Sequence, residues 1–350
     1  MSRQTIQSLT LPELTEAVTR MGEKPFRAKQ LYEWLHVKLA DDVSQMTNLP
    51  AAFRARLAEE YEFQPVRMAE SFLSELDGTR KFLFQLADGS VIESVLMKYH
   101  YGNSVCISSQ VGCRMGCRFC ASTLGGLERN LDAGEMLGQV YQIQKISGER
   151  VSHVVVMGSG EPLDNYDAFV RFVRMVSDER GLHLSQRNIT ASTCGLVEQI
   201  RRLAQEKLQI TLAISLHAPN DEKRRLLMPV ANRYRIEEII AACREYEEIT
   251  GRRITFEYSL VKGQNDGVQD AKELASVLSG LNCHVNLIPV NPIKERDYEA
   301  TEGPDAERFK NLLEKNHINA TIRRKLGADI GAACGQLRKS YLERTKEVSS

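Results

Sequence analysis

Three closely spaced cysteines are the residues of this chain best suited to carry chemistry. Cys113, Cys117 and Cys120 follow the spacing C-x3-C-x2-C, so one loop could place three thiolates around one metal centre. A structural zinc site normally has four protein ligands, and a bacterial ferredoxin run has another spacing and a fourth cysteine. Three thiolates would instead hold three irons of a [4Fe–4S] cluster and leave the fourth iron open. The amine and carboxylate of S-adenosylmethionine (SAM) can chelate an open iron, which reductive cleavage of SAM requires.

The residues around this triad resemble a known family. The spacing, with Phe119 before the last cysteine, resembles the motif of the radical SAM enzymes. The longer string has Cys106 seven residues before Cys113 and Ala-Ser-Thr-Leu-Gly-Gly-Leu-Glu-Arg-Asn-Leu at 121–131. That string is similar to the RlmN/Cfr family of RNA adenine methyltransferases. A zinc knuckle or scattered core cysteines would explain the short spacing but not the longer string.

Composition sets the general class of the protein. The chain has 350 residues, 42% hydrophobic and 26% charged, which is typical of a globular protein with more than one domain. It contains no run of eighteen apolar residues and no signal-peptide core near Met1, so we expect a cytoplasmic protein without membrane contact. Eight cysteines in a reducing compartment favour metal ligation or catalysis over a disulfide framework. The net charge of +0 gives no support for a nucleic-acid partner, which would need local basic patches.

Residues 1–75 are predicted to form a small helical domain. Apolar residues recur at helical spacing between Leu11 and about Phe63, and Pro25 is a plausible helix start. Charge alone favours a solvated helix face for the basic residues of this domain. The resemblance favours an accessory RNA-contact domain instead, in which phosphates would meet Arg20, Lys24, Arg27 and Lys29.

Residues 76–326 are predicted to form the α/β core. A hairpin is expected at 80–97, with its turn at Asp88-Gly89. Strands then alternate with helices, and the expected strands are 151–157, 187–193, 209–215, 253–259, 284–289 and 320–323. This alternation indicates a parallel sheet covered by helices. With the cysteine loop after the first strand, the count fits the partial (β/α)6 barrel usual in radical SAM enzymes. Function in such barrels collects at the C-terminal ends of the strands.

Small and polar residues follow several of these predicted strands. Each one alone would more often be a turn or capping residue. Their recurrence at one rim of the predicted barrel is harder to explain in that way. The resemblance implies that they bind SAM. The matching positions are Gly160, Glu161, Ser192, Ser215, Leu216, His217 and Asn291.

Two further sites are implied by the resemblance. Residues 327–350 are predicted to form a C-terminal loop whose Cys334 matches the family's methyl-carrying cysteine, although it could be a surface thiol. The run 323–325 just before it is basic and could contact phosphate. Glu93 by itself would be an outward-facing strand residue, but its place thirteen residues before Cys106 resembles a family glutamate assigned as a proton acceptor.

The resemblance implies a radical route, since carbon 2 of adenine is too electron-poor to attack the SAM methyl group. It uses two SAM molecules per turnover. Cys334 takes a methyl group from the first, and the reduced [4Fe–4S] cluster cleaves the second to a 5′-deoxyadenosyl radical. That radical removes a hydrogen from the S-methyl group, and the resulting methylene radical adds to the base and links RNA to protein. Cys106 then helps to remove the ring proton and forms a disulfide with Cys334, which releases the methylated base.

Three functions remain open on these residues. An RlmN-like enzyme would methylate adenine C2 in 23S ribosomal RNA and the adenine beside the tRNA anticodon. A Cfr-like enzyme would use the same motifs to methylate carbon 8 of an adenine in 23S ribosomal RNA and confer antibiotic resistance. A non-catalytic iron–sulfur RNA-binding module would have no use for Cys334 or the SAM positions. The strings 121–131 and 328–337 are closer to RlmN, and for that enzyme we expect a monomer that receives electrons from a donor such as flavodoxin.

Overall fold

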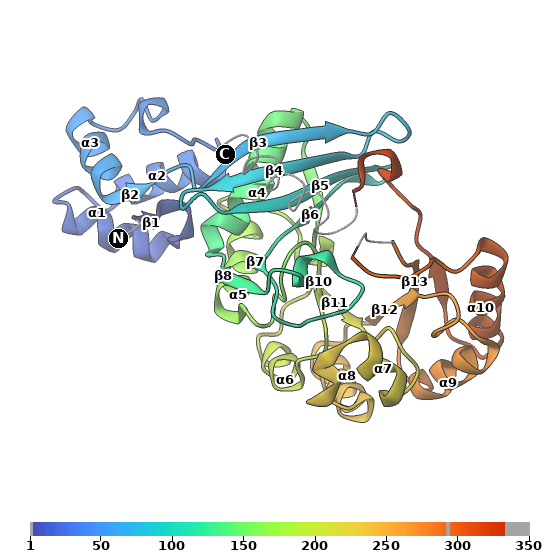
Figure 1. Ribbon diagram of the computed structural model, residues 1–350. Coiled ribbons are helices and arrows are strands. Elements are labelled where there is room, and N and C mark those ends of the chain that lie inside the picture. Colours follow the sequence, from blue (N-terminus) through green and yellow to red (C-terminus); the bar gives the residue numbers. More distant parts are fainter. Residues whose placement is uncertain (1–2, 292–294, 333–350) are drawn as a thin grey trace.

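The N-terminal part of the chain is a helical unit with its own hydrophobic core. The computed structural model describes residues 3–291 and 295–332. The unit contains α1 (Leu11–Arg20), α2 (Phe26–His36), α3 (Ala51–Glu60), the 3-10 turns η1 (Ile6–Ser8) and η2 (Val43–Gln45), and the parallel pair β1 (Gln4–Thr5) and β2 (Tyr61–Glu62). Their apolar faces meet in a cluster separate from the main core, which includes Leu14, Val18, Leu31, Phe53 and Leu57. A small N-terminal helical domain is therefore present, with its last element ending at Glu62, and it lies at one end of the molecule (Figure 1).

A ten-stranded sheet forms the rest of the protein, in the order β14-β13-β12-β11-β10-β9-β6-β5-β4-β3. Its parallel strands are β6 (Gly102–Ile107), β9 (Val151–Val156), β10 (Ile189–Thr193), β11 (Thr211–Ser215), β12 (Ile254–Leu260), β13 (Cys283–Pro289) and β14 (Ala320–Ile322). Three antiparallel strands extend the sheet beyond β6, namely β5 (Val91–Tyr99), β4 (Arg80–Leu86) and β3 (Val66–Leu73). Within the described ranges, the edge strands β3 and β14 do not pair with each other. The predicted partial barrel is therefore confirmed as an open sheet.

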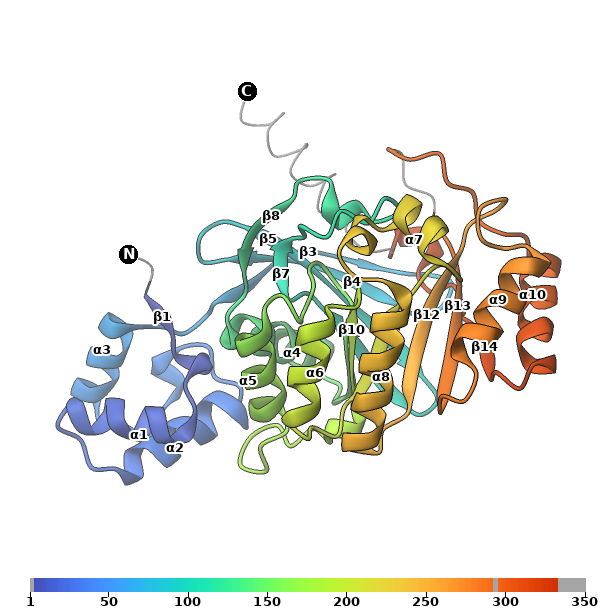
Figure 2. The same ribbon diagram turned by 90° about the horizontal axis from the view of Figure 1, so that it is seen from below.

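Helices cover one face of this sheet, as Figure 2 shows. They are α4 (Ala133–Ser147), α5 (Tyr166–Val176), α6 (Val197–Gln205), α8 (Ile236–Thr250), α9 (Val268–Leu278) and α10 (Gly303–Lys315). The short helix α7 (Asp221–Leu227) lies at the rim instead. The Val, Ile and Leu residues of the strands pack against the covering helices in the main core, whereas several residues of the opposite face are only partly buried. In the part of the chain that the structure describes, no helix combines the length and apolar character needed to cross a membrane.

Some elements do not follow from the hydrophobic pattern. Strand β3 has no regular apolar alternation and is largely exposed, yet it pairs with β4 over its whole length and so belongs to the large sheet. The short strands β7 (Gln110–Gly112) and β8 (Leu127–Asn130) form a separate hairpin on either side of the cysteine loop. Segments this short carry too few side chains for an alternating pattern, so long-range pairing decides their structure.

The helical unit is joined to the barrel by polar contacts, of which the bond between His36 and Tyr141 is buried. The Tyr32 hydroxyl lies 3.1 Å from a carboxylate oxygen of Asp178, and Nδ1 of His36 lies 2.8 Å from the Tyr141 hydroxyl. An ion pair of 2.6 Å joins Arg171 of α5 to Glu13 of α1. Burial lowers the pKa of His36 to about 3, so its imidazole is neutral at this junction.

Candidate active site

A cavity of about 230 Å³ lies where the parallel strands end, and the three predicted metal ligands line it. We call it the cysteine cavity. Most of its other lining residues come from the ends of β9, β10, β11, β12 and β13, so the cysteine loop faces the C-terminal rim of the barrel. The predicted site residues found here are Cys113, Cys117, Cys120, Gly160, Glu161, Ser192, Ser215, His217 and Asn291.

Backbone contacts fix the loop that carries the three cysteines. The N–H of Cys113 donates to the Gly126 carbonyl at 2.9 Å, which closes the base of the loop. The Arg118 N–H donates to the Leu227 carbonyl at the end of α7, also at 2.9 Å. The Thr123 hydroxyl lies 3.1 Å and 2.9 Å from the carbonyls of Cys117 and Cys120 and can donate to either. The loop is therefore shaped by hydrogen bonds of the chain itself.

The three thiols fit an iron–sulfur cluster. Burial raises the pKa of Cys113 to about 12 and raises that of Cys117, and the other cysteines of the triad raise both further. Thiols held this way become thiolates only when they bind a cation. Among the described residues, no three His, Cys, Asp or Glu side chains converge on a single ion. In a [4Fe–4S] cluster each thiolate binds a different iron, so three ligands around one cavity suit it.

Gly160 and Glu161 lie in the segment after β9. Gly160 lets this segment approach Gln110 closely, and Glu161 forms hydrogen bonds with neighbouring backbone groups. Gly160 has a φ of +106°, and a Cβ there would lie 2.6 Å from the Cβ of Gln110, so only glycine fits. The buried carboxylate of Glu161 accepts from the N–H groups of Cys194 at 2.7 Å and Leu163 at 3.0 Å. Burial raises the pKa of Glu161. Glu161 thus links the ends of β9 and β10 beside the cysteine cavity.

The remaining predicted SAM positions differ in where their side chains lie. The hydroxyl oxygens of Ser192 and Ser215 are 3.2 Å apart at the ends of β10 and β11. His217 has a φ of +57°, and its Nδ1 accepts from the Ser259 N–H at 2.9 Å, which leaves the proton on Nε2. Its ring meets Phe119 edge-on, with centroids 4.8 Å apart. By contrast, the Leu216 side chain packs in the main core and does not line the cavity.

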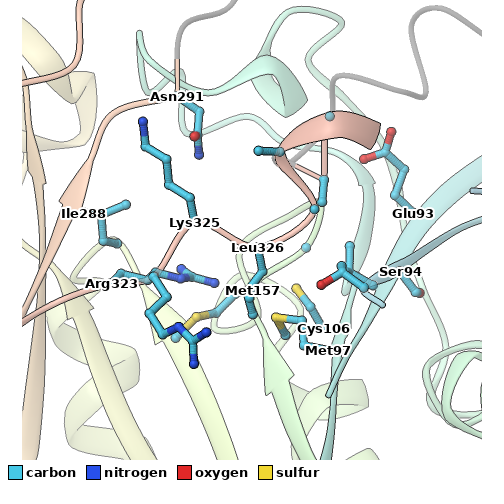
Figure 3. A pocket seen from close by; sticks show the side chains of 18 of the residues that line it. Glu93, Ser94, Met97, Cys106, Met157, Ile288, Asn291, Arg323, Lys325 and Leu326 are labelled. Carbon is cyan, nitrogen blue, oxygen red and sulfur yellow. The ribbon is translucent and has the colours of Figure 1, made fainter. Parts of the chain in front are cut away.

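A second cavity, of about 340 Å³, adjoins the first and is shown in Figure 3. We call it the hairpin cavity, because residues of β5 line one side of it and residues 323–328 line another. Cys106 and Met97 lie close together in it, and Arg323 and Lys325 approach from the opposite side (Figure 3). The residues that line both cavities are Met157, Gly158, Ile288, Asn291 and Arg323. The two cavities therefore lie side by side at the C-terminal ends of the strands.

Glu93 lies inside this second cavity. The pattern taken alone indicated an outward-facing residue, but the side chain is only 6% exposed and lines the cavity wall. The reason is Lys81 on β4, whose buried ammonium lies 3.4 Å from the Glu93 carboxylate. A buried carboxylate normally has such a partner, and one from a neighbouring strand cannot be recognised from local sequence.

Strand β4 and the turn between β3 and β4 also hold the C-terminal segment, residues 327–331, in place. The Lys81 ammonium donates to the Gly331 carbonyl at 2.9 Å, and the Gly327 N–H donates to the Asp77 carboxylate at 2.8 Å. The Ser74 hydroxyl donates to Asp329 at 2.6 Å, within the turn η6 (Ala328–Ile330). Cys334, the predicted methyl carrier, lies outside the described residues. No disulfide joins two of the described cysteines.

One residue of the site was not found from the sequence. Arg224 of α7 is completely buried behind the cysteine loop, and its guanidinium donates to backbone carbonyls. It stands next to the exposed Arg225 in a run of charged residues. The sequence gives no signal that distinguishes the two arginines.

Comparisons with known proteins agree with this architecture. A family model described as the radical SAM superfamily matches residues 107–275, and one described as the ribosomal RNA large subunit methyltransferase N-terminal domain matches residues 5–63. The crystal structure of a radical SAM methyltransferase from Sphaerobacter thermophilus has a TM-score of 0.92 and 46% identity, covering 95% of this chain and 98% of that one.

Two curated relatives are similar over nearly the full length. Both are named probable dual-specificity RNA methyltransferase RlmN. The protein from Lachnoclostridium phytofermentans is 64% identical and the alignment covers 97% of this chain and 96% of the relative. The protein from Lachnospira eligens is 61% identical, with 98% of each chain covered.

Proposed function

Because the chain belongs to the RlmN family of radical SAM RNA methyltransferases, we propose that it methylates carbon 2 of adenine. The substrates would be an adenine of 23S ribosomal RNA and the adenine next to the tRNA anticodon. The observation that carries this proposal is the pair of adjoining cavities. One holds the cysteine triad, and the other holds Cys106 beside the segment that leads to Cys334.

The residues of the cysteine cavity have roles in binding. Cys113, Cys117 and Cys120 would hold a [4Fe–4S] cluster, which in its reduced form supplies the electron that cleaves SAM. Ser192, Ser215 and Asn291 offer polar groups toward the same space. The neutral His217 adds an Nε2–H donor. An external one-electron donor such as flavodoxin would be needed, and we propose that the chain acts as a monomer.

The two cysteines outside the triad would route the methyl group. Cys334 as a thiolate takes a methyl group from one SAM molecule, and SAM leaves as S-adenosylhomocysteine. After hydrogen abstraction, the methylene radical on Cys334 adds to adenine C2. Glu93 or Cys106 then accepts the ring proton as the radical adduct gives one electron to a one-electron acceptor. Cys106 forms a disulfide with Cys334 while the bond from the Cys334 sulfur to the transferred carbon breaks, and that carbon takes up a proton to complete the methyl group. Two thiols are oxidised in this step, so a reductant must restore them before the next turnover.

Two other functions were considered. The named relatives reported above are RlmN proteins, and the resemblance of 121–131 to the same group favours C2 over C8. A non-catalytic iron–sulfur module would need a cluster site but not a second cavity with Cys106 and Glu93 on its wall. The enzyme is therefore the function that these residues support best.

The test is to identify the modified carbon. The chain is expressed in a bacterial strain lacking its own adenine-C2 methyltransferase, and its 23S ribosomal RNA and tRNA are digested and analysed by mass spectrometry against 2- and 8-methyladenosine standards. We expect 2-methyladenosine in both RNAs. A Cys117→Ala variant should restore neither and should lose iron and sulfide after anaerobic reconstitution. Appearance of 8-methyladenosine would refute the proposed regiochemistry, and a zinc-loaded wild type without iron would refute the radical mechanism.

A further inference from the structure

Arg224 is an unusual buried cation. Its side chain is 0% exposed. The guanidinium donates to the carbonyls of Cys194 at 2.6 Å, Leu216 at 3.2 Å and Tyr234 at 3.3 Å. All three acceptors are neutral, and within the described residues no carboxylate forms an ion pair with Arg224. Buried charges are normally paired or bound to a metal centre, because removing an unpaired charge from water is costly.

The side chains that could neutralise Arg224 are those of the cysteine cavity. Arg224 donates to the Cys194 carbonyl at 2.6 Å, and Cys194 packs against Cys117 and lines the cysteine cavity with it. Burial lowers the pKa of Arg224, and of the carboxylates, Asp221 on the same helix raises it. Asp221 is engaged elsewhere, because its carboxylate accepts from the Ile236 N–H at 2.8 Å and lies 3.5 Å from Arg235. Cys117, as a thiolate ligand of a bound cluster, would bring negative charge to this region. The arginine charge is therefore best balanced when the cysteine cavity is loaded.

We propose that Arg224 is a built-in counter-charge for the iron–sulfur cluster and raises the cluster's reduction potential. The inference rests on the proposed function in one respect, namely that the cysteine triad binds a cluster. Reduction adds one negative charge to a centre that three thiolates already make anionic. A cation fixed behind Cys117, in a region that excludes water, stabilises the reduced form more than the oxidised form. We expect the effect to be on the order of tenfold in the equilibrium constant for reduction.

A purely structural role is the competing explanation. The three carbonyl contacts join the ends of β10 and β11 to the segment after η5 (Pro229–Asn232), so Arg224 also holds the rim together. Replacement by lysine separates the two roles, because lysine keeps the charge but lacks the planar fork of donors. Replacement by methionine removes both. Arg225 provides a matched control, since it is the next residue of the same helix and is exposed.

The experiment measures the potential of the cluster without SAM or RNA. Wild type, Arg224→Lys, Arg224→Met and Arg225→Met are reconstituted anaerobically, assayed for iron and sulfide, and titrated potentiometrically with detection by electron paramagnetic resonance. We expect Arg224→Met to lower the midpoint potential by about 59 mV, which is tenfold for one electron. Arg224→Lys should keep the wild-type potential but melt at a lower temperature, and Arg225→Met should match wild type in both.

Each other outcome decides the question. An unchanged potential in Arg224→Met, or a fall in Arg224→Lys as large as that in Arg224→Met, overturns the inference. If Arg224→Met assembles no cluster, Arg224→Gln is titrated in its place and the same expectation applies. If Arg224→Met and Arg224→Gln both assemble no cluster while Arg224→Lys assembles one, the requirement for charge is supported. If Arg224→Lys also assembles no cluster, the role of Arg224 is structural only. A wild type that binds no iron refutes the proposed function itself.

Discussion

The ammonium nitrogen of Lys81 lies 3.4 Å from Oε2 of Glu93, and it also donates to the Gly331 carbonyl at 2.9 Å. The Lys81 and Glu93 side chains are 1% and 6% exposed. Lys81 therefore joins three parts of the chain at the wall of the hairpin cavity, namely β4, β5 and the C-terminal segment. This contact places the segment that leads to Cys334 next to the carboxylate that faces the cavity.

Removing this ammonium should affect both stability and methyl transfer. Lys81→Met removes the ammonium group from beside the buried Glu93 carboxylate. Breaking a buried ion pair lowers the free energy of unfolding by about 3–5 kcal/mol. We expect urea denaturation to show a loss of this size. The double variant Lys81→Met/Glu93→Gln should recover most of the stability but not RNA methylation, because the contact with Gly331 is still absent. The control Lys98→Met removes an exposed ion pair with Glu149 and should cost about 1 kcal/mol or less. Full activity of the double variant would contradict the anchoring role.

Gly160 should tolerate no side chain. An alanine there would have a strained positive φ, and its Cβ would meet both the side chain and the backbone nitrogen of Gln110 within 2.8 Å. Strain and overpacking together should cost roughly 2–6 kcal/mol. We expect Gly160→Ala to lower the melting temperature and weaken SAM binding, measured by calorimetry on the cluster-loaded protein. Gly303→Ala adds a methyl group into open space and should do neither. Equal SAM affinity in the two variants would show that the backbone at Gly160 does not shape the site.

Variants that lack Cys106 or Cys334 should stop at different steps of the proposed methylation reaction. Without Cys106 the adduct between Cys334 and RNA can form, but no second thiol releases it. Cys106→Ala purified from cells should therefore carry covalently bound RNA, visible on denaturing gels as a band that ribonuclease shifts. Cys334→Ala and the double variant should carry none. If Cys106→Ala turns over normally, or the double variant still carries RNA, the two-cysteine mechanism is wrong for this protein.

The junction at His36 should make the helical unit sensitive to acid. Burial holds the pKa of His36 near 3, whereas the unfolded chain binds this proton near pH 6.5. Between these values the unfolded state binds more protons, so stability is lost as pH falls from about 6.5 toward 3, by up to about 1.4 kcal/mol per pH unit. The fluorescence of Trp34, the only tryptophan, reports urea unfolding of this unit. His36→Asn should flatten the slope between pH 6.5 and 5, and the exposed His100→Asn should not. An unchanged slope in His36→Asn would assign the acid sensitivity to other groups.

The sequence predicted those parts of the molecule whose determinants are local. The alternating helices and strands and the cysteine spacing are read from neighbouring residues, and the fold agrees with them. The partners of Glu93 and Arg224 were not predicted, because burial and pairing depend on strands and loops distant in the chain. The Gly331 carbonyl that Lys81 binds is 250 residues away in sequence. Strand β3 was missed for the same reason, since its irregular pattern of apolar and polar residues becomes a strand by pairing with β4.

The open sheet determines how a long polymer could approach the site. The hairpin cavity lies between β5 and residues 323–332, on the side where the edge strands β3 and β14 remain unpaired within the described chain. A closed ring of strands would surround its contents and admit a polymer only by threading from an end. An open sheet has no such topological requirement, and the segment that runs across between its edges, residues 323–332, is held there by contacts with Ser74 and Asp77. An internal nucleotide can enter sideways, and the polymer's two ends can stay folded in their own structures throughout.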